Sequence, residues 1–175
     1  YWTQTIVTAS LAQKIATLID CDFNPATAYT AGLLLHLGIL TVVHLYPEEC
    51  NEIFVQAEQS NDSVNDLIQN FLGVDHYQVG YFLLARWQLP DVYQTILKEF
   101  SNKSYTGKHQ KLIQLLIHCN GFANHLYEHR EYDSLLIENP LKSIGASSID
   151  IESTLAEITN KLDNVIDLVR SLNAH

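Results

Sequence analysis

The sequence has no methionine, and its ten Lys and Arg residues are outnumbered by twenty Asp and Glu residues. The formal net charge is −10 at pH 7, and the basic residues form no stripe. Nucleic acid and anionic membrane surfaces both require clustered basic residues on the protein that binds them. We therefore expect neither as a partner. Because the chain begins at Tyr1 inside a helical pattern, we expect it to be part of a longer protein.

Cysteine is also scarce. The three cysteines lie far apart in the sequence and form no CxxC pair: Cys21, Cys50 and Cys119. An odd, unpatterned set argues against a disulfide framework and indicates thiols buried in a reducing compartment. The expected localisation is cytoplasmic.

Membrane-targeting signals are missing too. No signal peptide is recognisable, and the longest apolar stretch, Ala31 to Tyr46, is short for a membrane span and contains two histidines. We interpret this stretch as a buried core helix of a soluble protein. Hydrophobic residues make up 47% of the sequence and charged residues 17%, a balance typical of a folded core.

Helical patterns dominate, and no alternating β pattern of useful length occurs. Apolar residues recur at helical spacing near the start: Ile6, Ala9, Leu11, Ala12, Ile15, Ala16 and Ile19. Helix starts are predicted at Asn24-Pro25, Pro47, Asn61 or Asp62, and Asp75, and Pro90 precedes a further helix. Gly73 is predicted to end the helix that begins near Asn61. The polar stretch 101–107 predicts a loop before a long helix over about 108–129. The fold class expected is all-α, a multi-helix bundle.

The last segment has the most regular pattern. Its apolar residues are spaced alternately four and three apart, as in a coiled-coil seam: Ile151, Leu155, Ile158, Leu162, Val165, Val169 and Leu172. This seam either packs on the body of its own domain or pairs with another helix, for example in a homodimer. We therefore expect a helical domain over 1–130, an irregular linker over 131–148 and a C-terminal amphipathic helix over 149–175.

Three motifs occur in order along the chain. The first runs from Ala28 to Leu40 and contains AGLLLHLGIL. The second, LGVDHYQVG, ends at Gly80, and the third comprises Leu83-Leu84, Trp87 and Leu89-Pro90. Together they resemble the HDOD domain family, relatives of the HD-type metal-dependent phosphohydrolases, over about residues 1–125. It implies an HD-like helical scaffold, a role in bacterial signalling, and a further helical half preceding this chain.

Active HD phosphohydrolases hold their metals with histidines and aspartates, and the metals activate a water molecule and bind phosphate oxygens. By the resemblance, most of those positions carry other residues here. The His-Asp doublet reads Leu35 and His36, and a one-residue slip of the alignment still supplies no carboxylate. The other positions of this vestigial pocket are Gln4, His76, Glu99, His118 and Gly121. Only His76 stands at a ligand-like position, and stable transition-metal sites need three or four ligands. We expect no metal, no cofactor and no catalytic residue.

Two other histidine patterns could indicate a metal or ligand site. His125 to His129 formally matches HxxEH, an inverted zinc-peptidase motif, although its polar surroundings favour a solvated helix end. His36, His76 and His118 could share a pocket, although core histidines satisfied by hydrogen bonds are the more common outcome. We expect a structural role for His76 and not a ligand role, since an imidazole in the first turn of a helix can hydrogen-bond exposed backbone groups. Trp87 is expected to bury a large apolar surface.

Three functions follow from this pattern. The favoured one is a non-catalytic signalling module that acts through protein–protein interaction with other signalling proteins or domains. The alternative is a metal-dependent phosphohydrolase or phosphodiesterase with a non-standard ligand set, which would need at least three converging His, Asp or Glu side chains. The third is a receptor for a nucleotide, which the shortage of arginine disfavours.

Overall fold

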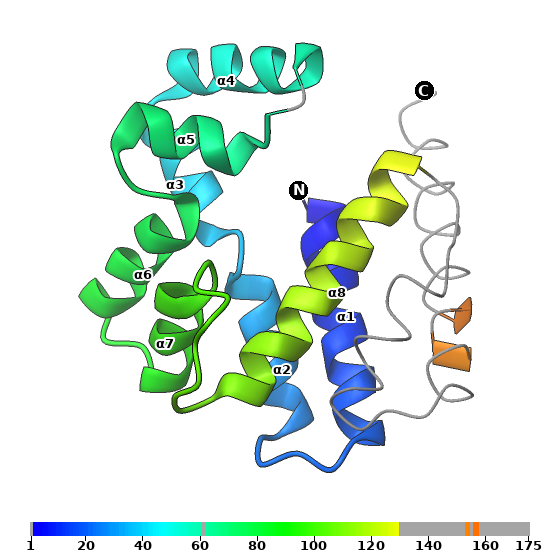
Figure 1. Cartoon of the computed structure of the whole chain (residues 1–175). Helices are drawn as coiled ribbons and strands as arrows, with labels where there is room; N and C mark the ends of the chain where they lie inside the picture. Colours follow the sequence, from blue (N-terminus) through cyan, green and yellow to red (C-terminus); the bar gives the residue numbers. More distant parts are fainter. Residues whose placement is uncertain (1, 61, 130–152, 155, 158–175) are drawn as a thin grey trace, which may run out of the picture. The chain divides into compact units, whose positions relative to one another are not determined.

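The computed structural model describes residues 2–60, 62–129, 153–154 and 156–157, without the side chains of 2 and 127–129. Every long regular element in these ranges is an α-helix, which confirms the all-α fold class (Figure 1). The helices are α1 (Trp2–Leu18), α2 (Pro25–Leu34), α3 (Leu37–Leu45), α4 (Pro47–Gln59), α5 (Val64–Leu72), α6 (His76–Arg86), α7 (Asp91–Glu99) and α8 (Gln110–His129).

The chain divides into two compact units, one formed by 1–33 with 111–175 and the other by 34–110. The first unit contains α1, most of α2 and most of α8, each with a buried apolar face. At Gly32 of α2, an added Cβ would lie 2.6 Å from the Cα of Ala9 in α1. The small-residue stripe of α1 therefore allows the backbones of α1 and α2 to approach closely.

The second unit depends on an even closer approach between α3 and α6. A Cβ on Gly38 of α3 would lie 1.7 Å from the carbonyl oxygen of His76, inside any possible contact distance. Gly80 lies on the α6 side of the same crossing, where its Cβ would be 3.4 Å from the Gly38 nitrogen and 3.1 Å from Leu97. The two motif glycines thus allow α6 to pack on α3 and α7 at once.

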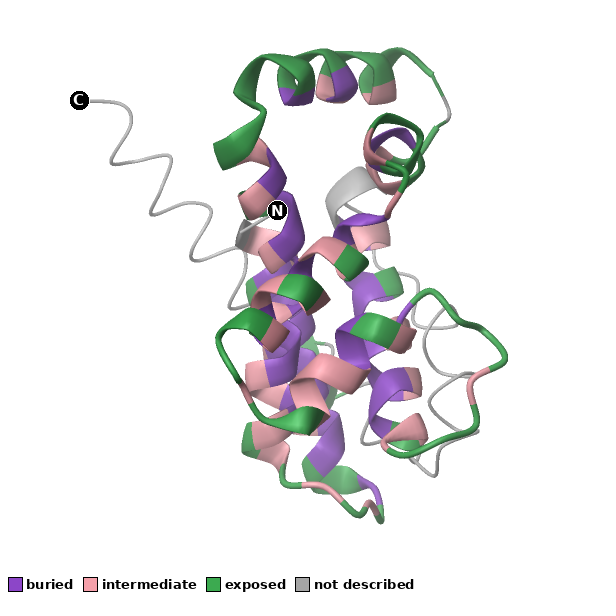
Figure 2. Ribbon diagram, turned by 90° about the vertical axis from the view of Figure 1, so that its left-hand side faces the viewer, coloured by how far each residue is buried: buried purple, intermediate pink, exposed green. Residues whose placement is uncertain are grey.

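A hydrophobic cluster holds α3, α4 and α5 together. Its buried members are Ile39, Val42, Cys50, Ile53, Leu67 and Ile68. Figure 2 shows the consequence for α4, which is buried on one side and exposed along the other. The α4–α5 pair therefore has a fixed inner face and an open outer face.

The helix ends of this unit follow the local sequence closely. Asp75 caps α6 in a capping box with Gln78, and its second carboxylate oxygen accepts a 2.6 Å hydrogen bond from the Ser101 hydroxyl. Gly73 ends α5 in the left-handed region with φ 77°, as predicted. The cap of α5 is Ser63, whose hydroxyl accepts from the Asp66 nitrogen, so the prediction of Asn61 or Asp62 was wrong.

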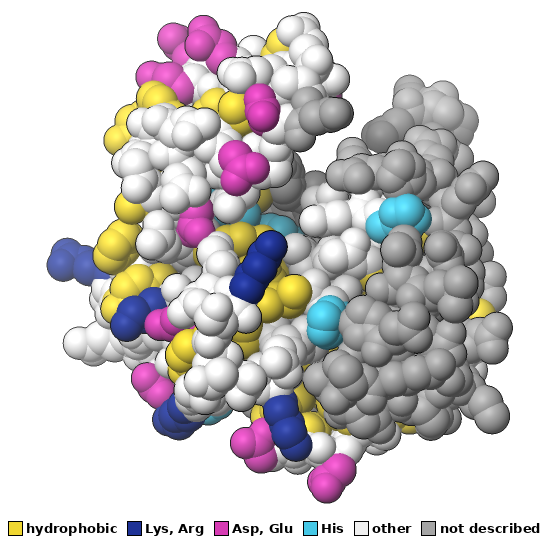
Figure 3. All heavy atoms as spheres, viewed as in Figure 1, with side chains coloured by type: hydrophobic (Ala, Val, Ile, Leu, Met, Phe, Trp, Pro, Cys, Tyr) yellow, Lys and Arg dark blue, Asp and Glu magenta, His cyan; other side chains and the backbone are white. Residues whose placement is uncertain are grey.

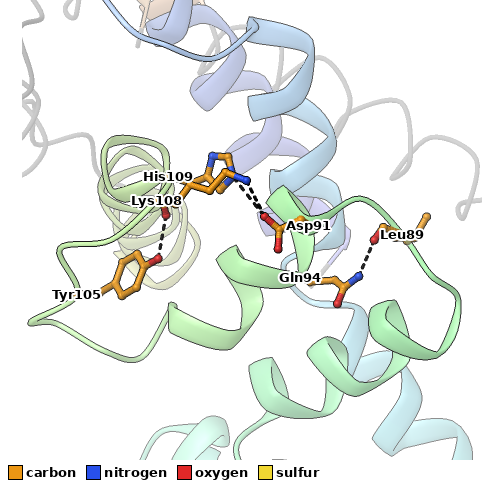
Figure 4. Close-up of polar contacts among 6 residues, drawn as sticks. All are labelled: Leu89, Asp91, Gln94, Tyr105, Lys108 and His109. Atoms are coloured by element: carbon orange, nitrogen blue, oxygen red, sulfur yellow. Dashed lines mark hydrogen bonds and ion pairs between the residues drawn. The ribbon is translucent and has the colours of Figure 1, made fainter.

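The loop after α7 is fastened to the start of that helix (Figure 4). The Lys108 ammonium donates a 2.9 Å hydrogen bond to the Asp91 carboxylate and lowers the pKa of that carboxyl group. The Tyr105 hydroxyl donates to the Lys108 carbonyl, and the Gln94 amide donates to the Leu89 carbonyl. The contacts of Tyr105 and Lys108 hold the loop predicted at 101–107. The next helix, α8, begins at Gln110, slightly after the predicted start near residue 108.

Three expectations need correction. The apolar segment up to Tyr46 is two helices, interrupted by a turn at Leu35 and His36, because Gly38 must come close to α6 just after it. Trp87 is 57% exposed, since it follows the end of α6 and lies outside the core. Ile6 is half exposed, although the rest of the predicted α1 stripe is buried.

The apolar helical segment also begins earlier than the stretch Ala31 to Tyr46. Pro25–Leu45, 21 residues, is long and apolar enough to cross a membrane by length and composition alone, the one such candidate among the described residues. Core helices of soluble proteins meet the same criterion, and this segment includes buried residues such as Ala28, Leu35 and Val42.

The C-terminal predictions lie mostly outside the described residues. The linker 131–148 and all seven seam positions from Ile151 to Leu172 fall there. Among the four described positions beyond residue 129, Glu157 forms an ion pair with Lys14 of α1 and Thr154 is buried. The domain boundaries and the pairing of the seam therefore stay predictions.

The packing at Gly38 generates a matched pair of substitutions. Gly38→Ala should destabilise the protein by about 3 kcal/mol or more, because its methyl group can be accommodated only by moving backbone. Gly121→Ala, on exposed surface of α8 with nothing within 4 Å, should stabilise it by about 0.5–1 kcal/mol. Urea unfolding of both variants measures the difference. Equal effects would contradict the proposed α3–α6 contact.

Candidate functional site

The candidate site of the second unit centres on two buried imidazoles. His36 lies in the turn before α3, and His76 is the first residue of α6, only 3% exposed. Their ring centroids are 5.7 Å apart with an interplanar angle of 20°, a stacked arrangement. The close α3–α6 crossing brings them together, because it joins the N-terminal ends of both helices.

Aromatic rings extend this stack. The Tyr77 ring lies 3.8 Å from the His76 ring and 6.5 Å from the His36 ring, measured between centroids. On its other side, Tyr77 lies 4.5 Å from Phe100 at the end of α7. The His76 ring is therefore buried against the ring of Tyr77, and its burial disfavours the charged form of this imidazole.

Asn65 of α5 determines the protonation of His76. Its side-chain oxygen accepts a hydrogen bond from the His76 backbone nitrogen at 3.2 Å, which identifies that atom as the oxygen and not the amide nitrogen. The same oxygen contacts the His76 Nδ1. An acceptor oxygen requires a donor, so Nδ1 carries the proton and Nε2 carries the lone pair.

The lone pair on Nε2 is buried. Within the described residues, His76 Nε2 has no hydrogen-bond partner. Burial, with a smaller contribution from the neighbouring His36, lowers the pKa of His76 to about 3. The ring is therefore neutral over the physiological pH range. The ring partner of His76 is the side chain of Asn65 and not a backbone group.

The remaining predicted positions of this unit offer little to a metal. Leu35 is completely buried and has no donor atom. Glu99, half-buried at the end of α7, accepts from the Asn102 amide at 3.1 Å and lies 3.9 Å from the Lys98 ammonium. Asp75 is buried beside His76, but both its oxygens already accept hydrogen bonds, in the capping box and from Ser101.

Three of the predicted pocket positions belong to the first unit, namely Gln4, His118 and Gly121. Gln4 on α1 and His118 on α8 are half-buried, and burial lowers the pKa of His118. Gly121 is exposed with open space around it. His125 and His129 do lie one turn apart on α8, as the HxxEH spacing requires, but the His129 side chain is outside the described part.

Metals of the HD type would need a cluster of donors. Over the described part of the chain, no group of three or more His, Cys, Asp or Glu side chains could hold a metal ion. Two imidazoles without a carboxylate fall short of the three or four ligands of a stable site. The described donors therefore do not fit the metals of active HD enzymes.

Sequence reasoning missed Asn65, although it sets the tautomer of His76. Asn65 is the second residue of α5, eleven positions before His76 and outside every motif. Its only sequence signal is an amide at the start of a predicted helix, where many asparagines occur for capping alone. Only the packing of α5 against α6 reveals the contact.

The neutral state of His76 predicts a pH-dependent stability. The unfolded chain protonates this imidazole near pH 6.5, whereas the folded chain does so near pH 3. Between these values the unfolded state binds more protons, so stability falls as pH decreases from 6.5. His76→Gln should flatten this dependence, reducing the loss between pH 6.5 and about pH 5 by roughly 1.5 kcal/mol.

The exposed His44 provides the control. His44→Gln should keep the wild-type pH dependence, because His44 lies on the exposed surface, away from the buried ring stack. Urea unfolding as a function of pH measures all three proteins. A wild-type slope in His76→Gln would show that His76 does not stay neutral in the folded state.

Asn65→Ala tests the tautomer directly. In the wild-type protein, long-range proton–nitrogen NMR should show His76 protonated at Nδ1, because Asn65 supplies an acceptor there. The variant should lose this preference and about 1–3 kcal/mol of stability, since a buried ring donor and a backbone nitrogen lose their partner. Protonation at Nε2 in the wild type would contradict the assignment.

Comparison with known proteins places this fold. A search of curated proteins finds no match. An HDOD domain protein of unknown function from Geobacter sulfurreducens is similar in structure, with a TM-score of 0.75 and 18% identity over 93% of this chain and 61% of that one. The MmoQ response regulator from Methylococcus capsulatus strain Bath has a TM-score of 0.72 and 23% identity, over 89% of this chain and 60% of that one.

A third similar structure, from Marinobacter aquaeolei VT8, is described provisionally as a signal transduction protein. It has a TM-score of 0.76 and 21% identity, over 96% of this chain and 38% of that one. The chain thus spans less than two thirds of each of these proteins. At these identities the similarity shows the fold. The family model for the HDOD domain matches residues 1–103, more than half of the sequence, and this chain therefore belongs to the HDOD domain family.

Proposed function

We propose that this chain is a soluble, non-catalytic module of bacterial cytoplasmic signalling, which acts by binding other signalling proteins or domains. Its membership of the HDOD family supports this role. So do the descriptions of two structural neighbours, one a response regulator and the other provisionally a signal transduction protein. Nucleic acid and membrane are not among the partners we propose.

The main support for a non-catalytic role is the pair of residues at the expected metal-binding doublet. Where the family resemblance puts a metal-binding His-Asp doublet, the chain has a fully buried leucine, Leu35, followed by His36 stacked on the neutral ring of His76. Leucine cannot ligate, and no carboxylate takes part in the pair. A metal-activated water would require at least one more ligand than the described residues bring together.

A retained scaffold without its chemistry suits a binding role. At the α3–α6 crossing, the motif glycines Gly38 and Gly80 have a packing role, because a Cβ at either position would lie against the neighbouring helix. The His76 imidazole is neutral and both rings are buried, so this site would contribute to stability and not to turnover. Recognition would then depend on the exposed surface.

Elemental analysis of tag-free protein, grown with iron, manganese and zinc, tests this proposal. We expect a metal-to-chain ratio near zero and no turnover of bis-p-nitrophenyl phosphate or cyclic dinucleotides. A ratio near one or two that is lost in His76→Gln, together with turnover, would establish the phosphohydrolase alternative. Metal lost equally in His44→Gln would come from exposed imidazoles and would favour the proposal.

A further inference from the structure

Positive charge is absent from a long part of the chain. No Lys or Arg occurs between Lys14 and Arg86. Exposed carboxylates are concentrated in the middle of that part, on α4, α5 and the connection between them: Glu48, Glu49, Glu52, Glu58, Asp62 and Asp66. Figure 3 shows these acidic side chains gathered over the α4–α5 region, with the basic side chains elsewhere.

None of these six carboxylates has an ion pair within the described residues. The ion pairs found there involve acidic residues of other segments, namely Asp91, Glu99 and Glu157. Ser60 and Ser63 donate hydrogen bonds to Asp62 and Asp66, but hydroxyl groups leave the negative charge in place. The α4–α5 region therefore presents uncompensated negative charge to its surroundings.

Apolar side chains are exposed beside this charge. Leu45, the last residue of α3, is 61% exposed, and the adjacent Tyr46 is 39% exposed. Tyr46 meets Phe71 of α5 edge to face at 5.5 Å between ring centroids, and Phe71 is itself 43% exposed. Tyr46 also precedes the first turn of α4, where Glu48 and Glu49 lie.

We call this region the acidic-aromatic surface and define it by six residues: Leu45, Tyr46, Phe71, Glu48, Glu49 and Glu52. It rests on a fixed base, because the inner sides of α3, α4 and α5 contribute to one hydrophobic cluster. A rigid aromatic pair beside unpaired carboxylates can anchor an apolar side chain and attract cations around it. Little ordering free energy is then lost on binding.

We infer that the acidic-aromatic surface binds a basic amphipathic helix of a partner protein, an inference that rests on the proposed signalling role. The apolar face of such a helix would cover Leu45, Tyr46 and Phe71, and its Lys or Arg residues would pair with Glu48, Glu49 and Glu52. Charge complementarity selects this occupant. Segment 149–175 of the chain itself has five acidic and two basic residues and would be repelled.

The probe is a fluorescent synthetic helix of about 18 residues, five turns, with leucine on one face and lysine on the other. Its controls are a scrambled lysine–leucine peptide and an analogue with glutamate in place of lysine. Anisotropy should show saturable binding of the ordered basic peptide, weakened by rising ionic strength. Equal binding of the scrambled or acidic peptide would overturn the inference.

Variants then locate the binding. Glu49→Gln with Glu52→Gln should weaken it roughly fivefold or more. Asp20→Asn with Asp22→Asn removes the same charge from exposed positions between α1 and α2 and should change it by less than about twofold. Phe71→Ser and Leu45→Ser should each weaken binding while circular dichroism stays unchanged. Equal losses in both charge doubles would mean attraction to net charge alone and would overturn the inference.

Sedimentation of the unliganded protein tests a second copy as the occupant. We expect no self-association that depends on Glu49 and Glu52, because copies of net charge −10 repel one another. A dimer dissociated by Phe71→Ser would assign the surface to another copy and overturn the inference. Failure of peptide binding, with no metal and no turnover, would refute this surface but not the signalling proposal.

Discussion

The contact between the backbone of Gly38 and the carbonyl of His76 is the constraint on which the second unit depends. There is no room for a side chain at this point, so α3 and α6 cross at the shortest distance that peptide groups allow. The crossing places Gly80 against both α3 and Leu97 of α7. It also places two histidines at the joined helix ends, so the same sterics that assemble the helices build the stacked pair.

Burial then decides the chemistry of that pair. Asn65 supplies an acceptor to the backbone and the ring of His76, and this ring is buried beside the ring of Tyr77. Under these conditions the imidazole is more stable uncharged, and its pKa falls far below the ordinary range. In an active HD site, a metal would use such a lone pair. Here the position before His36 is Leu35, and the described residues give the His76 Nε2 no hydrogen-bond partner.

The contrast between the interior and the α4–α5 surface is the other organising feature. The interior around His76 contains neutral rings and a single engaged carboxylate, Asp75. The outer side of α4 and α5 concentrates charge of one sign next to exposed aromatic groups. Such a surface stays solvated in the free protein because repelling carboxylates and water discourage self-association. An HDOD scaffold can thus combine a packed interior with a surface that carries charge of one sign.

The sequence by itself determined the helical class, most helix boundaries and the family. Capping residues and glycine stops act within a few residues of the chain, so Asp75, Gly73 and Pro47 could be interpreted without a structure. The motif residues also led to the prediction that Leu35 and His36 depart from a metal site. Local signals were less reliable where several candidates compete, as at Ser63, which caps α5 in place of Asn61 or Asp62.

Only the tertiary structure decided how distant residues meet. The break between α2 and α3, the exposure of Trp87, the role of Asn65 and the contact of Tyr46 with Phe71 all depend on contacts between separate helices. Periodicity shows which face of a helix is apolar but not which neighbour covers it or whether any does. That is why the sequence could predict a core, while the tautomer of His76 and the exposed aromatic pair required the packed molecule.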